Sequence, residues 1–292
     1  MRTAIISVLA LAAGSFALDC NGNSALCDRA YSHVTFVGSH NAPFHVDIPG
    51  FPNQHTNVTA QLNQGVRFLQ AATKNKDGVA EMCHTSCDTL DAGTLEKYLE
   101  EIKSWVDANA NEVVTLLLTN GDAINITKFD DAFKAAGLYQ YVFTPKAQLG
   151  LDDWPTLGKL INDGTRVIVL MDYHADTSEV PYILDEFNTY YFETPFDPIQ
   201  DQLSSCGIDR PPDASADGRM ILANHNLNYK LPLTDDTLIP EKLSAIDTNS
   251  VKSIMAQVDT CVGSYKRYPN VVLLDWISVG DAMKAQNQLN GI

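Results

Sequence analysis

The chain contains little positive charge and, beyond its first residues, no long hydrophobic run. Its 292 residues include 20 Lys and Arg against 36 Asp and Glu, so the formal net charge is −16. A surface that binds nucleic acid needs clustered basic side chains, and this balance argues against such a partner. It also argues against strong electrostatic docking to anionic membranes, which leaves at most a transient contact with a membrane surface. No segment after the N-terminus has enough uninterrupted apolar residues to cross a bilayer.

Other absences narrow the class of protein further. The chain has no G-x-S-x-G sequence, so serine hydrolase chemistry has little support, and it has neither a P-loop nor a dinucleotide-binding fingerprint. No low-complexity tract and no Gly/Ser linker divides it. A chain of this size with 45% hydrophobic residues is long enough for one large core. We therefore expect a single domain over residues 18–292, present as a monomer.

The N-terminus has the layout of a secretory signal peptide. In MRTAIISVLALAAGSFA, one basic residue precedes an apolar run from Ala4 to Ala13, and small residues follow at Ser15 and Ala17. A short anchor helix is the alternative, but the run is too short to span a bilayer. We expect residues 1–17 to be removed and the protein to be secreted to the extracellular space.

The six cysteines are interpreted in that oxidising compartment, where paired thiols are the default. Six cysteines allow 15 pairings. Sequence proximity favours two short bridges and leaves a long one, namely Cys20–Cys27, Cys83–Cys87 and Cys206–Cys261. The long bridge closes the largest loop, so chain entropy predicts that it stabilises most, by about 4 kcal/mol. Two N-x-T sequons, at Asn57 and Asn125, are expected glycan acceptors in the same compartment.

Apolar and β-branched runs recur along the chain, with helical patterns between several of them. Four runs are nearly continuous, as expected of strands buried on both faces of a parallel sheet. The strand candidates are residues 33–39, 65–73, 78–84, 112–120, 166–173, 189–194, 219–226 and 270–277. Helices are expected at 94–109, with Thr94 as N-cap, at 248–262 and at 279–290, and a surface loop at 210–217. The pattern predicts a TIM-type (β/α)₈ barrel, distorted because little room remains for a helix between the second and third strands.

Polar side chains occur where these runs stop, which is where barrel enzymes carry their chemistry. The strand ends present His40, Asn41, His84, Asn120, Asp172, His174, Asn224, His225, Asp275 and Trp276. A single histidine at a strand end is more often a hydrogen-bonded structural residue than a catalytic one. A buried carboxylate is costly unless it is paired, and orienting a histidine is one way to pair Asp275, whereas Asp172 could equally cap a helix or bond loop amides. Two histidines, one of them oriented by a carboxylate, form a general base and general acid pair.

The histidine in AEMCHTSCDTLDAG, residues 80–93, allows three interpretations. Zinc held by Cys83, His84 and Cys87 needs a fourth ligand and reduced thiols, which secretion disfavours. A redox pair would more naturally show C-x-x-C than the C-x-x-x-C of this stretch. The favoured interpretation is a short disulfide that holds the backbone on both sides of His84 and fixes this side chain opposite His40.

Four stretches of the chain carry a resemblance to a known family. In order, they are VGSHNAPF, QLNQGVRFLQAAT, EMCHTSCDTLDAGTLEKYLEEIKSWVDANANEVVTLLL and NVVLLDWISVGDAMKAQNQLN. They resemble the X-type catalytic domain of phosphatidylinositol-specific phospholipase C, in the PLC-like phosphodiesterase superfamily, and most of all its small secreted fungal-type branch. The resemblance implies that His40 is the general base that deprotonates the inositol 2-hydroxyl and that His84 is the general acid that protonates the diacylglycerol oxygen. It implies that Asp275 orients the base, and Asn41 matches a calcium-ligating Asn of the animal enzymes.

The chain departs from this family at the charge that stabilises the phosphate. Gln70 and Ala72 occupy positions where the family has carboxylates and, in bacterial members, an arginine, and Thr119 precedes Asn120 where animal enzymes place another carboxylate. Calcium prefers several oxygen ligands that include carboxylates, so we expect no calcium or magnesium site and no other cofactor. Ala72 cannot replace a guanidinium bound to phosphate. The possible substitutes are His225, His174, Lys74 and Lys230.

The leading hypothesis is a metal-independent phosphodiesterase of the phospholipase C type that cleaves an inositol-type phosphodiester. Its catalytic residues would be His40, His84 and Asp275, and its substrate-binding residues Asn41, Gln70, Asn120, Asp172, His225 and Trp276. The alternative is a weakly active or inactive barrel that binds an inositol, sugar or lipid headgroup, as Gln70 and Ala72 suggest. A third reading, the sphingomyelinase D or glycerophosphodiester type, is less favoured. Those enzymes place two carboxylates shortly after the first histidine, where this chain has only Asp47.

Overall fold

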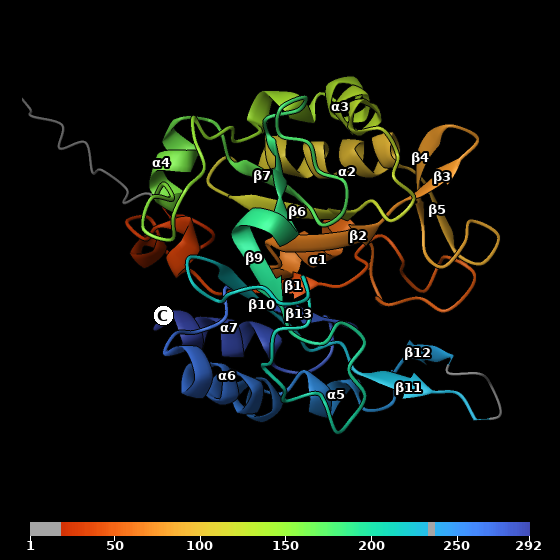
Figure 1. The fold of residues 1–292 in the computed structure, drawn as a ribbon, viewed down its shortest axis with the longest axis vertical. Helices are drawn as coiled ribbons and strands as arrows, with labels where there is room; N and C mark the ends of the chain where they lie inside the picture. The colour runs from red at the N-terminus through yellow and green to blue at the C-terminus, as the bar shows by residue number, and fades with distance from the viewer. Residues whose placement is uncertain (1–18, 233–236) are drawn as a thin grey trace, which may run out of the picture.

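A curled sheet of eight parallel strands forms the centre of the molecule (Figure 1). The computed structural model describes residues 19–232 and 237–292, so the expected signal peptide at 1–17 lies outside the described residues. The strands are β1 Phe36–Ser39, β2 Phe68–Ala72, β6 Val114–Thr119, β7 Val167–Met171, β8 Ile183–Asp185, β9 Tyr191–Glu193, β10 Met220–Asn224 and β13 Val271–Leu274. Their order across the sheet is β8-β7-β6-β2-β1-β13-β10-β9, and every pairing is parallel.

The expected distorted barrel is confirmed, with one strand exchanged. Seven of the eight strand candidates lie in the central sheet, but the candidate at 78–84 does not. It forms β4 (Val79–Cys83), which pairs antiparallel with β3 (Lys74–Lys76) and β5 (Asp91–Thr94) in a separate sheet. Asp77 and Gly78, both at positive φ, turn the chain between β3 and β4, and an Asp-Gly pair between two runs is a hairpin signal. The strand that completes the central sheet is β8, whose three residues are too few to show a periodic pattern.

The barrel is not closed by hydrogen bonds. Within the described residues, β7 is the only strand that pairs with β8 and β10 is the only strand that pairs with β9, so no ladder joins the two edge strands. A π-helical turn, η4 (Glu186–Tyr190), connects β8 to β9 and packs against both of them and β7. The opening between the edge strands therefore contains η4 and is the distortion of the barrel.

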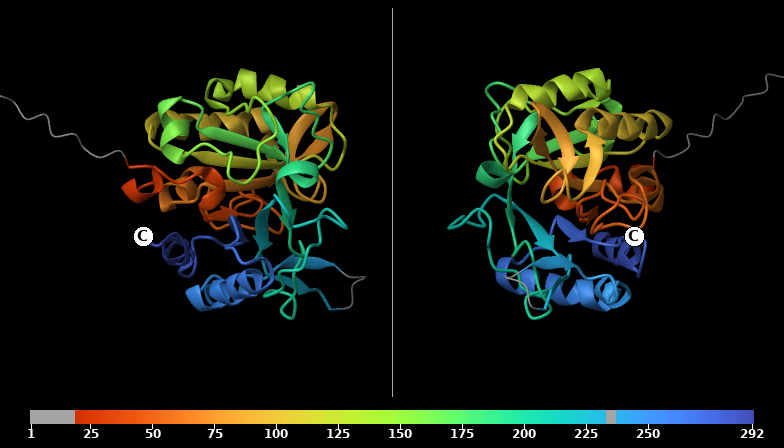
Figure 2. Two further views of the ribbon diagram at one scale, coloured as in Figure 1. Left: turned by 60° about the vertical axis from the view of Figure 1, so that its left-hand side comes forward. Right: turned by 90° about the vertical axis from the view of Figure 1, so that its right-hand side faces the viewer.

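Helices cover the outside of the sheet, α2 and α3 over one end of the strand order and α6 and α7 over the other (Figures 1 and 2). The helices are α1 Val58–Gln64, α2 Leu95–Ala108, α3 Ile126–Ala135, α4 Leu157–Asn162, α5 Ala245–Thr248, α6 Val251–Tyr265 and α7 Ala282–Asn290. The short elements are η1 Ser24–Leu26, η2 Tyr31–His33, η3 Leu138–Tyr141 and the hairpin β11 Asn228–Lys230 with β12 Leu238–Pro240. The three helices expected from periodicity are confirmed, and the Thr94 side chain caps α2 by accepting from the backbone N of Lys97.

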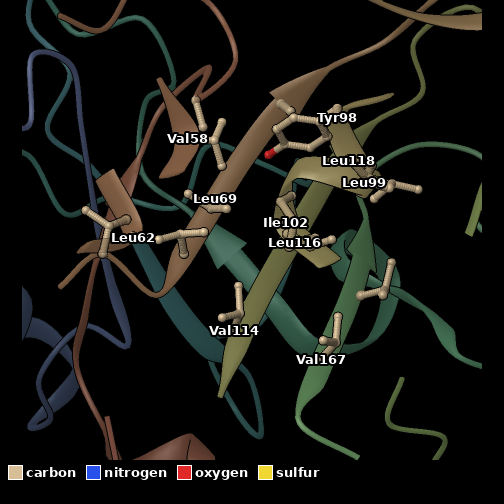
Figure 3. Packing of buried hydrophobic residues seen from close by; sticks show 14 of the residues in the cluster. Val58, Leu62, Leu69, Tyr98, Leu99, Ile102, Val114, Leu116, Leu118 and Val167 are labelled. Carbon is tan, nitrogen blue, oxygen red and sulfur yellow. The ribbon is translucent and has the colours of Figure 1, made fainter. Parts of the chain in front are cut away.

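The core holds the strand ends in place from two sides. On the outer side, Leu99 and Ile102 of α2 pack with Leu116 and Leu118 of β6 (Figure 3). On the inner side, the alternate side chains of the strands, such as Leu117, fill the barrel interior. Full burial of one such side chain contributes about 1.5–3 kcal/mol, so the two layers together make the strands a rigid frame.

All three predicted disulfides are present. They join Cys20 to Cys27, Cys83 to Cys87 and Cys206 to Cys261, and no described cysteine is free. Among the described residues, no helix combines the length and the apolar character needed to cross a bilayer.

Candidate active site

A cavity of about 270 Å³ opens at the carboxyl ends of the barrel strands. The lining comes from residues in or after β1, β2, β3, β6, β7, β9, β10 and β13, together with the loop after β4. Its ionisable side chains are His40, Lys74, His84, Asp172, Glu193, Asp197 and Arg210. The two histidines that the sequence analysis selected therefore line one cavity, although one follows a barrel strand and the other follows the antiparallel sheet.

His40 is held by a carboxylate at the end of the neighbouring strand. Ser39 of β1 pairs with Leu274 of β13, so the residues that follow them, His40 and Asp275, lie side by side. The distance from His40 Nδ1 to Asp275 Oδ1 is 2.9 Å, and Asp275 is almost fully buried. On the other side of the ring, Asn41 Nδ2 lies 3.1 Å from His40 Nε2. When Nδ1 donates to Asp275, Nε2 is an acceptor that receives a hydrogen bond from Asn41 Nδ2, so a hydroxyl group that gives its proton to this nitrogen must displace the Asn41 amide.

Two buried amide side chains from one loop tie these strand ends together. Asn53 Nδ2 donates to Asp275 Oδ1 at 2.9 Å, across 222 positions of sequence. Gln54 Nε2 donates to the backbone oxygens of His40 at 2.8 Å and Leu274 at 3.0 Å. The sequence analysis missed both residues, because no local pattern identifies partners so far apart in the chain.

His84 reaches the cavity from outside the barrel sheet. It follows β4, and the Cys83–Cys87 disulfide closes a short loop around it. The His84 backbone N donates to the oxygen of Leu90 at 3.1 Å, and its ring lies 5.8 Å from the ring of Phe44, centroid to centroid. Within the described part of the chain, the ring itself has no hydrogen bond. The loop backbone, and not a polar partner, therefore positions the His84 side chain.

The pKa values of the two histidines are shifted in opposite directions. Burial lowers the pKa of His40, but the charge and hydrogen bond of Asp275 outweigh it, so this pKa lies above its ordinary value of 6.5. Burial, followed by the positive charges of His40 and Lys74, lowers the pKa of His84 to about 4. In the free protein near neutral pH, His84 is therefore neutral, and any proton on the pair resides on His40.

Comparison with known proteins decides the family. The family model described as PI-PLC X 1 matches residues 26–290. The chain belongs to the PI-PLC X domain family. It is 50% identical to the PI-PLC X domain-containing protein 1 of Arthroderma benhamiae over 280 residues, which cover 94% of this chain and 90% of that protein. An uncharacterized secreted protein of the same organism is 43% identical over 270 residues, which cover 90% of this chain and 61% of that protein.

Solved structures of low sequence identity share the fold of this PI-PLC X domain. The phosphatidylinositol-specific phospholipase C of Listeria monocytogenes matches with a TM-score of 0.59 at 15% identity, covering 91% of this chain and 95% of that one. The F249X mutant of the Staphylococcus aureus phosphatidylinositol-specific phospholipase C matches with a TM-score of 0.62 at 12% identity, covering 90% and 94%. The likeness extends over about nine-tenths of this chain.

The residues at the implied calcium position of this PI-PLC X domain do not fit that ion. Gln70 Oε1 accepts from the Asn41 backbone N at 2.7 Å, and Gln70 Nε2 donates to Thr119 Oγ1 at 3.1 Å. Ala72 also lines the cavity and supplies no ligand. Calcium sites need several oxygens, usually with carboxylates among them. Gln70 is instead engaged in positioning Asn41 beside His40.

Three of the six expected substrate-binding residues line the cavity: Asn41, Gln70 and Asp172. Asp172 also bonds loop amides, which is one of the two options that the sequence left open: its Oδ1 accepts from the backbone N of Asn120 at 3.2 Å and of Tyr173 at 2.7 Å. Burial raises the pKa of Asp172 to about 7, and the neighbouring Glu193 also raises it, against the opposing effect of its hydrogen bond to Thr119.

The other three, Asn120, His225 and Trp276, do not line the cavity, so the structure gives their expected role no support. Asn120 bonds its own loop through the backbone of Ile124. His225 is buried, with Nδ1 at 2.8 Å from Gln257 Oε1 and Nε2 at 3.0 Å from the Thr248 oxygen. The ring of Trp276 is buried against His55. All three residues follow strands at the rim that carries the cavity, but their side chains turn into the protein.

Of the four residues proposed as substitutes for the phosphate-stabilising charge, only some line the cavity. Lys74 lines the cavity, whereas His174, His225 and Lys230 do not. Another cation, Arg210, also lines it and was missed, because the Pro-rich stretch 210–217 was interpreted only as a surface loop. Glu193 and Asp197 were missed as well, although a carboxylate that ends an apolar strand, as Glu193 ends β9, was a usable signal.

Proposed function

We propose that this PI-PLC X domain is a secreted, metal-independent phosphodiesterase of the phospholipase C type, which cleaves an inositol-type phosphodiester. The observation that carries the proposal is the His40–Asp275 pair, joined at 2.9 Å, in one cavity with His84. The names of the solved structures that share its fold support a lipid headgroup as the substrate.

The proposed reaction removes a proton from the attacking oxygen on one side of the phosphate and adds a proton to the leaving oxygen on the other. His40 Nε2 takes the proton of a substrate hydroxyl, whose oxygen then forms a bond to phosphorus. The bond from phosphorus to the lipid oxygen breaks, and His84 gives its proton to that leaving oxygen. The products are a cyclic phosphate and a diacylglycerol, and no covalent enzyme intermediate forms.

The proton affinities of the histidines favour this direction. The reactive form carries its proton on His84, whose pKa is about 4, and ends with the proton on His40, whose pKa is above 6.5. That transfer is downhill, but it makes the reactive form a minor one in the free protein. A phosphodiester anion beside His84 stabilises the imidazolium and raises its pKa, so substrate binding increases the reactive population.

Secretion, glycosylation and a monomeric state belong to the same proposal. A relative of 43% identity is named a secreted protein, and the three disulfides suit an oxidising compartment. Asn57 and Asn125 are both exposed N-cap residues, of α1 and α3, and so are accessible to glycosylation.

Replacing His84 tests the proposed reaction. We expect His84→Ala to lower kcat for release of cyclic inositol phosphate from phosphatidylinositol by about 100-fold or more, because the leaving oxygen loses its proton donor. His174→Ala is the matched control, since His174 is exposed and does not line the cavity. Equal activity of His84→Ala and the unaltered protein would rule out the proposed role.

A second candidate is a barrel that binds an inositol, sugar or lipid headgroup without cleaving it. The neutral side chains of Gln70 and Ala72 in the cavity favour it, because they remove the expected phosphate-stabilising charge. Measurable binding of inositol phosphate by calorimetry, together with no hydrolysis over a panel of phosphodiesters, would support this candidate. Sustained turnover would exclude it.

A further inference from the structure

A phosphodiesterase site needs positive charge near the phosphate. In this chain, β2 does not supply it, although bacterial members of the family carry an arginine at the corresponding strand end. Gln70 and Ala72 at the end of β2 are uncharged. Charge that develops on the phosphoryl oxygens is stabilised by preorganised donors, and removal of one costs on the order of 100-fold or more in rate. Apart from the two histidines, the described residues that line the cavity include two basic side chains, Lys74 and Arg210.

Arg210 is built firmly into the wall of the cavity. Its Nε donates to Glu193 Oε2 at 3.0 Å, and its Nη2 donates to the same oxygen. The guanidinium carbon lies 4.3 Å from the ring centroid of Phe196 and 5.3 Å from that of Phe187. The side chain is only 22% exposed, so the contacts of one carboxylate and two aromatic rings fix its orientation before any ligand arrives.

The guanidinium keeps hydrogen-bonding capacity for a ligand. Arginine has five N–H donors in a rigid plane, and both bonds to Glu193 use Nε and Nη2. Within the described residues, Nη1 has no hydrogen bond. Its two donors are therefore available to the oxygens of an anion, in the geometry that suits phosphate.

Apart from its partner Glu193, three carboxyls near Arg210 lie in surroundings that favour their protonated form. Burial raises the pKa of Asp172 to about 7, and it raises the pKa values of Asp197 and Glu186 as well. These groups are easily protonated neighbours, whereas Arg210 is always charged. The positive charge of Arg210 also acts on His40, where it opposes the rise in pKa that Asp275 causes.

Lys74 is a weaker candidate for the same task. Its Nζ lies 3.0 Å from Asp122 Oδ1, and both side chains are about one-third exposed, at 32% and 31%. An exposed, flexible ammonium already paired with a carboxylate is screened by solvent and loses side-chain entropy when it is ordered on a ligand. Arg210 is less exposed and already oriented.

We propose, on the basis of the phosphodiesterase function above, that Arg210 is the residue that binds the phosphate of the substrate and offsets its charge in the transition state. Arg210 lies in the loop between β9 and β10. Its guanidinium would replace the arginine that bacterial members of the family carry at the end of the second strand. Nη1 donates to a non-bridging phosphate oxygen while Glu193 holds the other edge of the guanidinium.

Binding of inorganic phosphate tests this assignment without requiring turnover. We expect the unaltered protein to bind phosphate, detected by calorimetry, and Arg210→Met to weaken that binding by at least tenfold. Arg267→Met, which removes an arginine outside the cavity, should change the Kd by less than about threefold. No phosphate binding by the unaltered protein, or equal binding by Arg210→Met, overturns the assignment. A larger loss in Lys74→Met than in Arg210→Met overturns it as well.

Kinetics on phosphorothioate substrates test the contact itself. If Arg210 donates to one non-bridging oxygen, the unaltered protein should cleave the two phosphorothioate diastereomers of phosphatidylinositol at different rates, and this preference should diminish in Arg210→Lys and Arg210→Met. Arg210→Lys keeps a positive charge next to buried Glu193. If Arg210→Met fails to fold, the stereoselectivity of Arg210→Lys therefore serves as the test of the contact. Unchanged stereoselectivity overturns the proposal. Phosphate binding that depends on Arg210, with no turnover of any substrate, would instead refute only the proposed function.

Discussion

The two sides of the cavity hold their histidines by different means. On one side, His40 follows a barrel strand, and its ring contacts Asp275 and Asn41, with Asn53 bonded to the same carboxylate. On the other side, His84 follows a small antiparallel sheet, and its position depends on a disulfide-closed loop. Hydrogen bonding by a buried carboxylate raises the proton affinity of one ring, whereas the absence of such a partner lets burial lower that of the other. The structural difference is therefore also the chemical difference between the two groups.

The largest effect is expected from Asp275→Asn. The substitution removes the charge that raises the pKa of His40 and orients its ring, so kcat/KM should fall by about 100-fold or more. The upper limb of the pH profile should move to lower pH. Asp259→Asn, an exposed position on α6, is the control in the same steady-state assay. A residual activity above about half of the original would show that His40 does not depend on the carboxylate.

The pH dependence of kcat/KM measures both sides together. Below the His84 pKa of about 4, both histidines are protonated and no base is available. Above the His40 pKa, which exceeds 6.5, both are neutral and no acid is available. We therefore expect kcat/KM to fall about tenfold per pH unit beyond each limit, with a plateau between them. Activity that continues to rise up to pH 10 would contradict the assignment of a protonated histidine.

Removal of single disulfides separates local positioning from global stability. The Cys83–Cys87 bridge spans 4 positions and the Cys206–Cys261 bridge spans 55, so chain entropy predicts losses of about 2 and 4 kcal/mol in the free energy of unfolding. We expect Cys83→Ser with Cys87→Ser to lower kcat about tenfold, because the His84 loop loses its restraint. Cys206→Ser with Cys261→Ser should lower stability more and kcat by less than about twofold. Denaturant titration and kinetics below both transitions measure the two effects, and the reverse ranking would refute the role given to the short bridge.

The smallest effect on activity is expected at His225, the buried histidine that follows β10. His225→Ala breaks hydrogen bonds with Gln257 and Thr248 and should lower the free energy of unfolding by about 1–3 kcal/mol. The kcat of the folded protein should change by less than about twofold, since His225 does not line the cavity. A large loss of kcat with unchanged stability would mean that His225 contributes charge to the site after all.

Features that depend on local sequence patterns could be predicted from the sequence, and they include most of the fold. Apolar runs located seven barrel strands, helical periodicity located α2, α6 and α7, and cysteine spacing led to the correct disulfides. The strand-end histidines His40 and His84 were also visible, because an apolar strand that stops at a polar residue leaves a clear signal. The segment 78–84, which forms β4, was misassigned to the barrel even though the Asp77-Gly78 turn of its hairpin was present in the sequence.

Only the tertiary structure decided which of these polar residues face each other. His40 and His225 end strands in the same way, yet one lines the cavity and the other turns into the core, because the packing behind each strand differs. Asn53 donates a hydrogen bond to Asp275 across 222 positions of sequence. Arg210 lies in a stretch that was predicted to be a surface loop, yet its side chain pairs with Glu193 in the wall of the cavity. Burial and long-range pairing are properties of the assembled barrel, which is why the sequence alone indicated the two histidines but not the arginine that lines the same cavity.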